Sequence, residues 1–135
     1  MKDEKDEPPD APWSGSGKPQ DLKERLREYA LRIIRLYDSL PKHGAVHVIT
    51  YQLVRSGTSP GAHYREACRS KSNADFISKM NIALKEARET HYWLRLIRDS
   101  ELVQTDRLNG LLQEADEIKR IIGAIVHKSR ERTSD

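Results

Sequence analysis

The chain has 135 residues, which is enough for one domain and short of two domains of ordinary size. Apolar residues make up 36%, charged residues 33% and aromatic residues 6%, a balance typical of an amphipathic helical protein. The sequence contains no run of about 18 apolar residues and no apolar stretch near its N-terminus, which argues against a membrane span and a secretory signal. A single cysteine, Cys68, cannot form an intrachain disulfide and points to a reducing compartment, so we expect a cytoplasmic protein.

The formal net charge of +3 is unevenly distributed along the chain. Residues 1–20 hold three lysines and five acidic residues, so the remaining residues carry a net charge of +5. A basic folded part is compatible with binding to nucleic acid or to an acidic protein. An excess of this size also serves solubility alone, and both interpretations remain open.

Residues 1–20 combine charged residues with four prolines and two glycines and offer almost nothing to bury. Such a segment does not recover the entropy lost on ordering. We therefore predict a disordered acidic tail and linker over residues 1–20. One folded domain follows over residues 21–130, and a frayed polar C-terminus is expected over residues 131–135.

Prolines mark the end of the first helical segment and a bend within the second. The first segment begins at Asp21, an N-cap residue type, and ends before Pro41. The second begins near residues 42–45 and contains Pro60, which lacks a backbone donor and crowds the preceding turn. Because the helical pattern resumes at Tyr64, we predict a kink, with a loop between two shorter helices as the alternative. The apolar face of the first segment consists of Leu22, Leu26, Tyr29, Ile33, Leu36 and Leu40.

The last two segments show apolar residues at spacings of three and four. Ser72 or Asn73 is expected to cap the third segment, and the fourth begins near Thr105. The stripe of the third segment is Phe76, Met80, Ala83, Ala87, Thr90, Leu94 and Ile97. That of the fourth is Leu108, Leu111, Ala115, Ile118, Ile122 and Ile125. The sequence therefore predicts an all-α protein, an up-and-down antiparallel four-helix bundle with a kinked second helix.

The sequence shows no recognisable catalytic constellation. No histidine has a glutamate three positions before it, as the inward-facing ligands of di-iron bundles require. His43 and His47 lie four residues apart, for which exposure at a helix start is a simpler explanation than a zinc site. Cys68 has no base that the sequence nominates, so we interpret it as a packing residue. We expect a protein that is not an enzyme and needs no cofactor or metal.

Several polar side chains lie at the edges of the predicted apolar faces. Carboxylates inside a bundle need cationic or hydrogen-bonded partners. Such residues form either a buried polar network or a solvated rim, and the sequence leaves both possibilities open. The candidates are Arg55, Glu66, Glu86 and Glu89.

The central third of the chain resembles the bacterial four-helix-bundle family named for rRNA intervening sequences. The first motif is an R-S-x-x-S-x-x-x-N-x-x-E-A pattern, and the residues that match it are Arg55, Ser56, Ser59, Glu66 and Ala67. The second is similar to D-F-x-x-K-x-x-I-A-x-x-E-A-x-E-T-x-x-W-L, and its matches are Asp75, Phe76, Lys79, Ile82, Ala83, Glu86, Ala87, Glu89, Thr90, Trp93 and Leu94. Pro60 and His63 depart from the pattern, since the family usually has an aliphatic residue and an asparagine there.

The resemblance implies a ring-shaped homopentamer of four-helix bundles. It also links the chain to the accessory proteins of diversity-generating retroelements, basic pentameric bundles that bind a reverse transcriptase and nucleic acid. Our first hypothesis is therefore a non-enzymatic homo-oligomer that binds RNA or DNA through a basic surface, as an accessory factor to a reverse transcriptase. The alternative is a protein-interaction scaffold that binds no nucleic acid.

Individual residues are assigned to these roles as candidates. Basic side chains neutralise phosphates without a defined motif, and the nucleic-acid candidates are Arg65, Arg69, Lys71, Lys119 and Arg120. Tyr92 and Trp93 are adjacent on one helix, so they cannot both face the same core. We predict that Tyr92 and Trp93 take part in packing between subunits.

Overall fold

The computed structural model describes residues 19–101, 103, 104 and 106–134. The described residues form α1 (Pro19–Ser39), α2 (Gly44–Gly57), α3 (Ser59–Cys68), α4 (Asn73–Ser100) and α5 (Asp106–Ser134). No strand occurs within those ranges. The predicted tail lies outside them except for residues 19 and 20, which already belong to α1. At the other end, α5 continues through residues 131–134, where we expected a frayed terminus.

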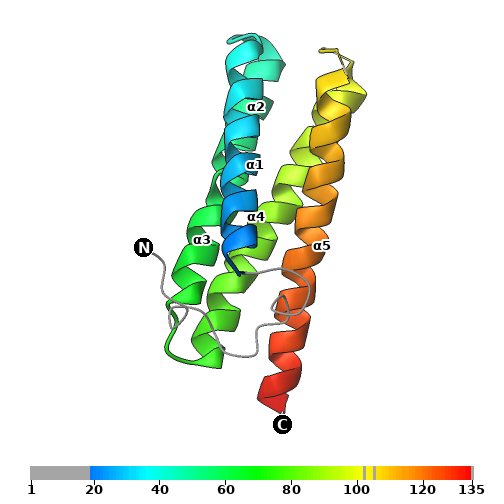
Figure 1. Ribbon diagram of the computed structural model, residues 1–135. Coiled ribbons are helices and arrows are strands. Elements are labelled where there is room, and N and C mark those ends of the chain that lie inside the picture. Colours follow the sequence, from blue (N-terminus) through cyan, green and yellow to red (C-terminus); the bar gives the residue numbers. More distant parts are fainter. Residues whose placement is uncertain (1–18, 102, 105, 135) are drawn as a thin grey trace.

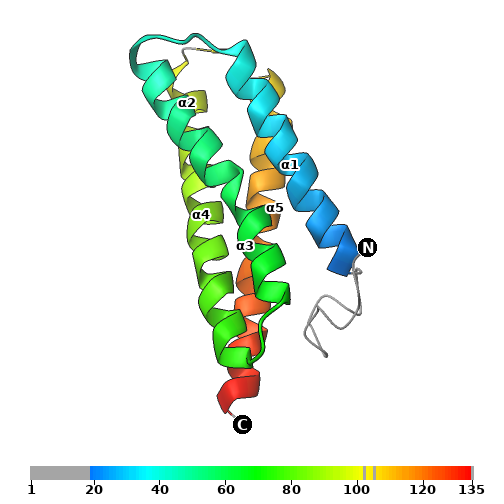
Figure 2. The same ribbon diagram turned by 90° about the vertical axis from the view of Figure 1, so that its left-hand side faces the viewer.

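The helices form an antiparallel bundle in which α2 and α3 together make one bent rod (Figures 1 and 2). α4 packs against α2, α3 and α5, and α1 packs against α2, α3 and α5. Each rod therefore has two close neighbours, and α1 lies diagonally across the bundle from α4. This arrangement confirms the predicted four-helix fold, because an amphipathic helix buries its apolar stripe against two neighbours of the same kind.

The core consists of the predicted apolar stripes. Five of the six residues of the first predicted stripe, from Leu22 to Leu36, are buried, and Leu40, just beyond the end of α1, is half-buried against the core. All seven predicted stripe residues of α4 are buried, and so are all six of α5. Among the described residues, no helix has the length and the apolar character that a membrane crossing requires.

Local signals fix the ends of the helices. Lys42 Nζ donates hydrogen bonds to the carbonyls of Tyr37 and Leu40, at 2.7 and 3.0 Å, and so satisfies acceptors that the end of α1 leaves open. Of the two candidate caps for α4, the structure uses Ser72, whose Oγ accepts a hydrogen bond from the Asp75 N–H at 3.1 Å. α2 begins at Gly44 with φ +71°, a conformation that glycine adopts at no steric cost.

The second helix is kinked rather than interrupted by a loop. Thr58, between α2 and α3, keeps helical backbone angles, and its N–H still donates to the Val54 carbonyl at 3.1 Å. Pro60 has no N–H for the Ser56 carbonyl, and the hydroxyls of Ser56 and Thr58 bond to carbonyls four residues before them. A missing donor and such back-bonding hydroxyls both bend helices. The predicted kink is therefore confirmed.

Gly57 lies at the inner side of this kink. A Cβ atom at this position would overlap Cδ1 of Ile33 on α1 and lie 3.3 Å from Cγ2 of Thr90 on α4. Three helices therefore approach one another closely at a residue that has no side chain. This contact sets the depth at which the bent rod sits between α1 and α4.

Candidate nucleic-acid interface

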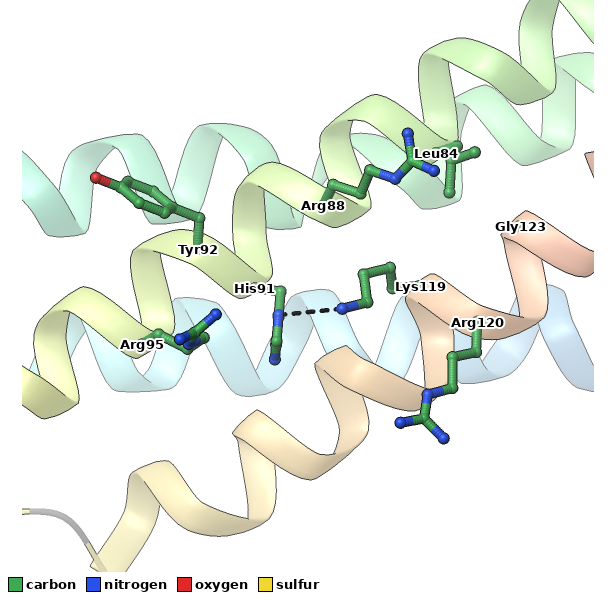
Figure 3. Close-up of a pocket in the computed structure, with 8 residues that line it drawn as sticks. All are labelled: Leu84, Arg88, His91, Tyr92, Arg95, Lys119, Arg120 and Gly123. Atoms are coloured by element: carbon green, nitrogen blue, oxygen red, sulfur yellow. Dashed lines mark hydrogen bonds between the residues drawn. The ribbon is translucent and has the colours of Figure 1, made fainter.

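A basic groove runs between α4 and α5 on the surface of the bundle. Its volume is about 470 Å³, which falls within the range of about 300–1,000 Å³ typical of ligand sites. We call this site the basic groove, and its lining residues are Leu84, Arg88, His91, Tyr92, Arg95, Lys119, Arg120 and Gly123. Figure 3 shows these side chains on the two neighbouring helices.

Helical spacing brings the lining residues together. Arg88, Tyr92 and Arg95 follow one another at intervals of four and three, so they share one side of α4. On α5, Lys119 and Gly123 are likewise four residues apart. A Cβ atom at Gly123 would meet only Leu84 Cδ1, at 3.8 Å. The missing side chain therefore keeps space open between the two helices at this point.

Lys119 and His91 face each other across the groove (Figure 3), with Nζ and Nδ1 3.4 Å apart. Partial burial lowers the pKa of His91, and the positive charges of Lys119 and Arg95 lower it further. His91 is therefore uncharged at neutral pH, and its Nδ1 accepts a hydrogen bond from the Lys119 ammonium group.

The groove retains an excess of positive charge. Asp116 on α5 forms ion pairs with Lys119 at 3.3 Å and with Arg120 at 3.0 Å. A single negative charge therefore faces two positive charges. Arg88 and Arg95 are exposed, and neither forms an ion pair with a carboxylate of the described part of the chain. Arginine presents a planar fork of donors that matches phosphate oxygens. The site is therefore suited to an anionic ligand with several phosphate groups.

The structure places the five nucleic-acid candidates in two separate regions. Lys119 and Arg120 line the basic groove. Arg65, Arg69 and Lys71 are exposed at the end of α3 and in the turn that follows it. α3 does not neighbour α5 in the bundle, so these three residues do not join the groove. Sequence reasoning passed over Arg88 and Arg95 because their neighbours Lys85, Glu86 and Glu89 give α4 the alternating charge of an ordinary solvated face.

A polar network connects α2 to α4. Arg55 contacts both Glu86, at 3.2 Å, and Glu89, and its Nε also donates to Gln52 Oε1 at 2.9 Å. Glu86 is only 9% exposed, so the guanidinium supplies the partner that a buried carboxylate needs. Glu89 additionally accepts a hydrogen bond from the indole N–H of Trp93 at 3.0 Å.

Glu66 does not belong to this network. It lies on α3, three helical turns beyond Arg55, and its side chain is exposed. Of the two possibilities that the sequence left open, Glu66 therefore occupies a solvated rim, whereas Glu86 is a buried member of a network. The expectation that groups Glu66 with Arg55 is corrected accordingly.

Tyr92 and Trp93 occupy different environments. Trp93 is half-buried and packs against the core, whereas Tyr92 is 55% exposed at the edge of the basic groove. Their rings meet in an edge-to-face contact with centroids 5.1 Å apart. Other large apolar side chains are also exposed on α2 and α4, and these are Val48, Tyr51, Ile82 and Leu96.

The remaining candidates show no catalytic or metal-binding arrangement. Cys68 is buried, and His47 packs against the ring of Tyr37, with centroids 6.1 Å apart. Within the described ranges, no group of three or more His, Cys, Asp or Glu side chains is placed to hold a metal ion.

Comparison with known proteins places the chain in a family. The profile of the family described as 23S rRNA-intervening sequence protein matches residues 19–124. A crystal structure of a protein of unknown function from the S23 ribosomal protein family of Bacteroides thetaiotaomicron is similar, with 39% sequence identity and a TM-score of 0.70. The match covers 78% of this chain and 97% of that one. No curated protein matches the chain significantly. The matched region contains the whole bundle core up to Ile122, and the chain therefore belongs to the 23S rRNA-intervening sequence protein family.

Proposed function

We propose that this protein is a non-enzymatic module that binds nucleic acid by neutralising backbone phosphates in the basic groove. The observation that carries this proposal is the meeting of four cationic side chains from two helices around one groove. These are Arg88, Arg95, Lys119 and Arg120.

The electrostatics of the groove support a polyanion over a single small anion. Arg88 and Arg95 are seven residues apart on α4, so their positions differ by about 10 Å along the helix axis. A chain of phosphates lets each of these guanidinium groups bind its own phosphate. Phosphate contacts of this kind supply most of the affinity of sequence-independent binding, and they release condensed counterions.

We propose further that the protein acts as a homo-oligomer in the cytoplasm. The resemblance to the accessory proteins of diversity-generating retroelements favours a pentameric ring and a role beside a reverse transcriptase. The exposed apolar side chains Val48 on α2 and Ile82 and Leu96 on α4 are available for contacts between copies.

The same exposed apolar side chains favour a second candidate function, a protein-interaction scaffold without nucleic-acid binding. In that case the charges of the basic groove serve solubility, and the partner is another protein. The two functions differ in their response to salt, because exposed ion pairs at a protein interface add little affinity.

The test is the binding of labelled RNA and DNA, each single- and double-stranded, at about 50 and 200 mM salt. Four phosphate contacts predict a loss of about 50- to 150-fold in affinity over this range. The double variant Arg88→Ala/Arg95→Ala should bind less tightly at low salt, and its loss over the same range should shrink to about 7- to 12-fold.

A matched control is available in the same chain. Arg65→Ala/Arg69→Ala removes the same number of charges from α3 and its end, outside the groove. It should bind nearly as the wild type does. No detectable binding by the wild type at low salt refutes the proposed function and favours the scaffold. Equal losses in the two double variants refute the groove as the binding site.

A further inference from the structure

We infer that the ligand of the basic groove is single-stranded, with an unpaired base stacked on the exposed ring of Tyr92 while its phosphates lie against the cations. This inference rests on the proposed function and specifies the kind of nucleic acid that the groove accepts.

The first observation is the position of Tyr92. Tyr92 is 55% exposed, and it lines the groove between Arg88 and Arg95, which lie one turn to either side along α4. In Figure 3 the ring projects outward from α4, on the side away from Lys119. A strand whose phosphates contact the arginines can therefore turn a base toward this ring. Aromatic side chains placed beside a basic groove are typical of proteins that bind single strands.

The second observation is that the ring is held in place. Trp93 meets Tyr92 edge to face, and the Trp93 indole is itself fixed by its hydrogen bond to Glu89. Glu89 is in turn paired with Arg55 of α2. A series of contacts thus runs from α2 across to the edge of the groove. A ring that is already held loses little side-chain entropy when a base stacks on it.

The dimensions of the groove disfavour a duplex. Adjacent packed helices lie about 8–10 Å apart, so the groove between α4 and α5 is a shallow furrow that does not admit a double helix. In a duplex, moreover, both faces of each internal base are already stacked on neighbouring bases. Only an unpaired base offers a free face to Tyr92 without a cost in unstacking.

The lining of the groove also predicts tolerance of sequence. Its eight residues include no asparagine, glutamine, aspartate or glutamate, the side chains that read adenine and cytosine edges. Stacking, in contrast, is available to every base. The arginines and the lysine of the lining can also bond guanine edges, so we expect similar affinities for single strands of different composition that lack guanine.

The experiment compares Tyr92→Leu with Tyr51→Leu, which alters an equally exposed tyrosine on α2 outside the groove. The ligands are a single-stranded oligonucleotide, the duplex of the same sequence, and inorganic polyphosphate, which carries charge but no bases. Wild type should prefer the single strand. Tyr92→Leu should lose about 5- to 150-fold in affinity for it and little for polyphosphate, while Tyr51→Leu stays near wild type. Tyr92→Phe, which keeps the ring, should also stay near wild type.

The outcomes separate this inference from the proposed function. Equal wild-type affinity for single strand and duplex, or equal effects of Tyr92→Leu and Tyr51→Leu, overturns the inference. The groove is then still a phosphate site if Arg88→Ala/Arg95→Ala weakens binding. A smaller mass in solution for Tyr92→Leu assigns Tyr92 to subunit packing and also overturns the inference. Absence of any nucleic-acid binding by the wild type overturns both proposals.

Discussion

The tight contact at Gly57 yields a prediction whose magnitude follows from the structure. In Gly57→Ala the new methyl group overlaps Cδ1 of Ile33, which is fully buried and has no solvent to move into. Overpacking of this kind costs about 1–3 kcal/mol. Alanine regains about 0.5–1 kcal/mol over glycine within a helix. We therefore expect a net loss of up to about 2.5 kcal/mol in the free energy of unfolding.

A second substitution isolates the steric part of this loss. Ile33→Val removes the Cδ1 atom and by itself should cost about 0.5–1.5 kcal/mol. In the double variant the overlap is gone, so its loss should be smaller than the sum of the two single losses by about 1 kcal/mol. The measurement is urea unfolding of the four proteins, followed by far-UV circular dichroism at one protein concentration. A difference of about 1 kcal/mol moves the midpoint by about 0.3–1 M urea.

Two results contradict this reasoning. If the single losses add to within about 0.3–0.5 kcal/mol, the two residues are not coupled through a steric clash. If Gly57→Ala stabilises the protein, the backbone adjusts without cost, and the kinked rod is not held at a fixed depth by this contact.

Three further predictions concern charge and capping. Arg25 lowers the pKa of Glu117 through a hydrogen bond. The contribution of this pair to the free energy of unfolding is therefore complete above the ordinary glutamate pKa of 4.5 and is lost as the pH falls below that value. Acid unfolding should therefore depend less steeply on pH in Glu117→Gln, and an unchanged slope contradicts this. Ser72→Ala should cost about 1 kcal/mol in urea unfolding through loss of the α4 cap, whereas Ser78→Ala, exposed within the same helix, should cost nothing. Burial and neighbouring cations lower the pKa of His91, and a bound phosphate favours its protonated form. Affinity for polyphosphate should thus rise as the pH falls from about 7 to 5.5, with a smaller rise in His91→Gln; equal rises would exclude His91.

The sequence was sufficient to predict the fold because the apolar spacing within each helix indicates which of its residues are buried. Residues such as Phe76, Met80 and Leu94 recur at the bundle spacing, and burial in the structure follows that spacing. Pro60 likewise marks the kink, since the loss of a donor is a property of the residue itself. At the C-terminus the residues are polar, so spacing gives no apolar signal for where α5 ends.

The candidate site was only partly predictable, because a groove depends on two helices at once. Periodicity shows that Arg88 and Arg95 share one side of α4, but it does not show which side of α5 faces them. Gly123 was the available signal, since a glycine within a helix and away from its ends often serves close packing or leaves space. For Glu66 the sequence left a buried network and a solvated rim both open, because a position at the edge of an apolar face is compatible with either, and the structure shows an exposed side chain.

The contacts of Trp93 give the protein an optical reporter of its own. Of the two tryptophans in the chain, Trp13 lies outside the described residues, and Trp93 adjoins the edge of the basic groove. Indole emission responds to the polarity around the ring and to nearby quenching groups, and here the carboxylate of Glu89 and the phenol of Tyr92 both contact it. In a Trp13→Phe background, the fluorescence of Trp93 alone would follow occupancy of the groove. Ligand titrations would then require no attached dye and no label on the nucleic acid.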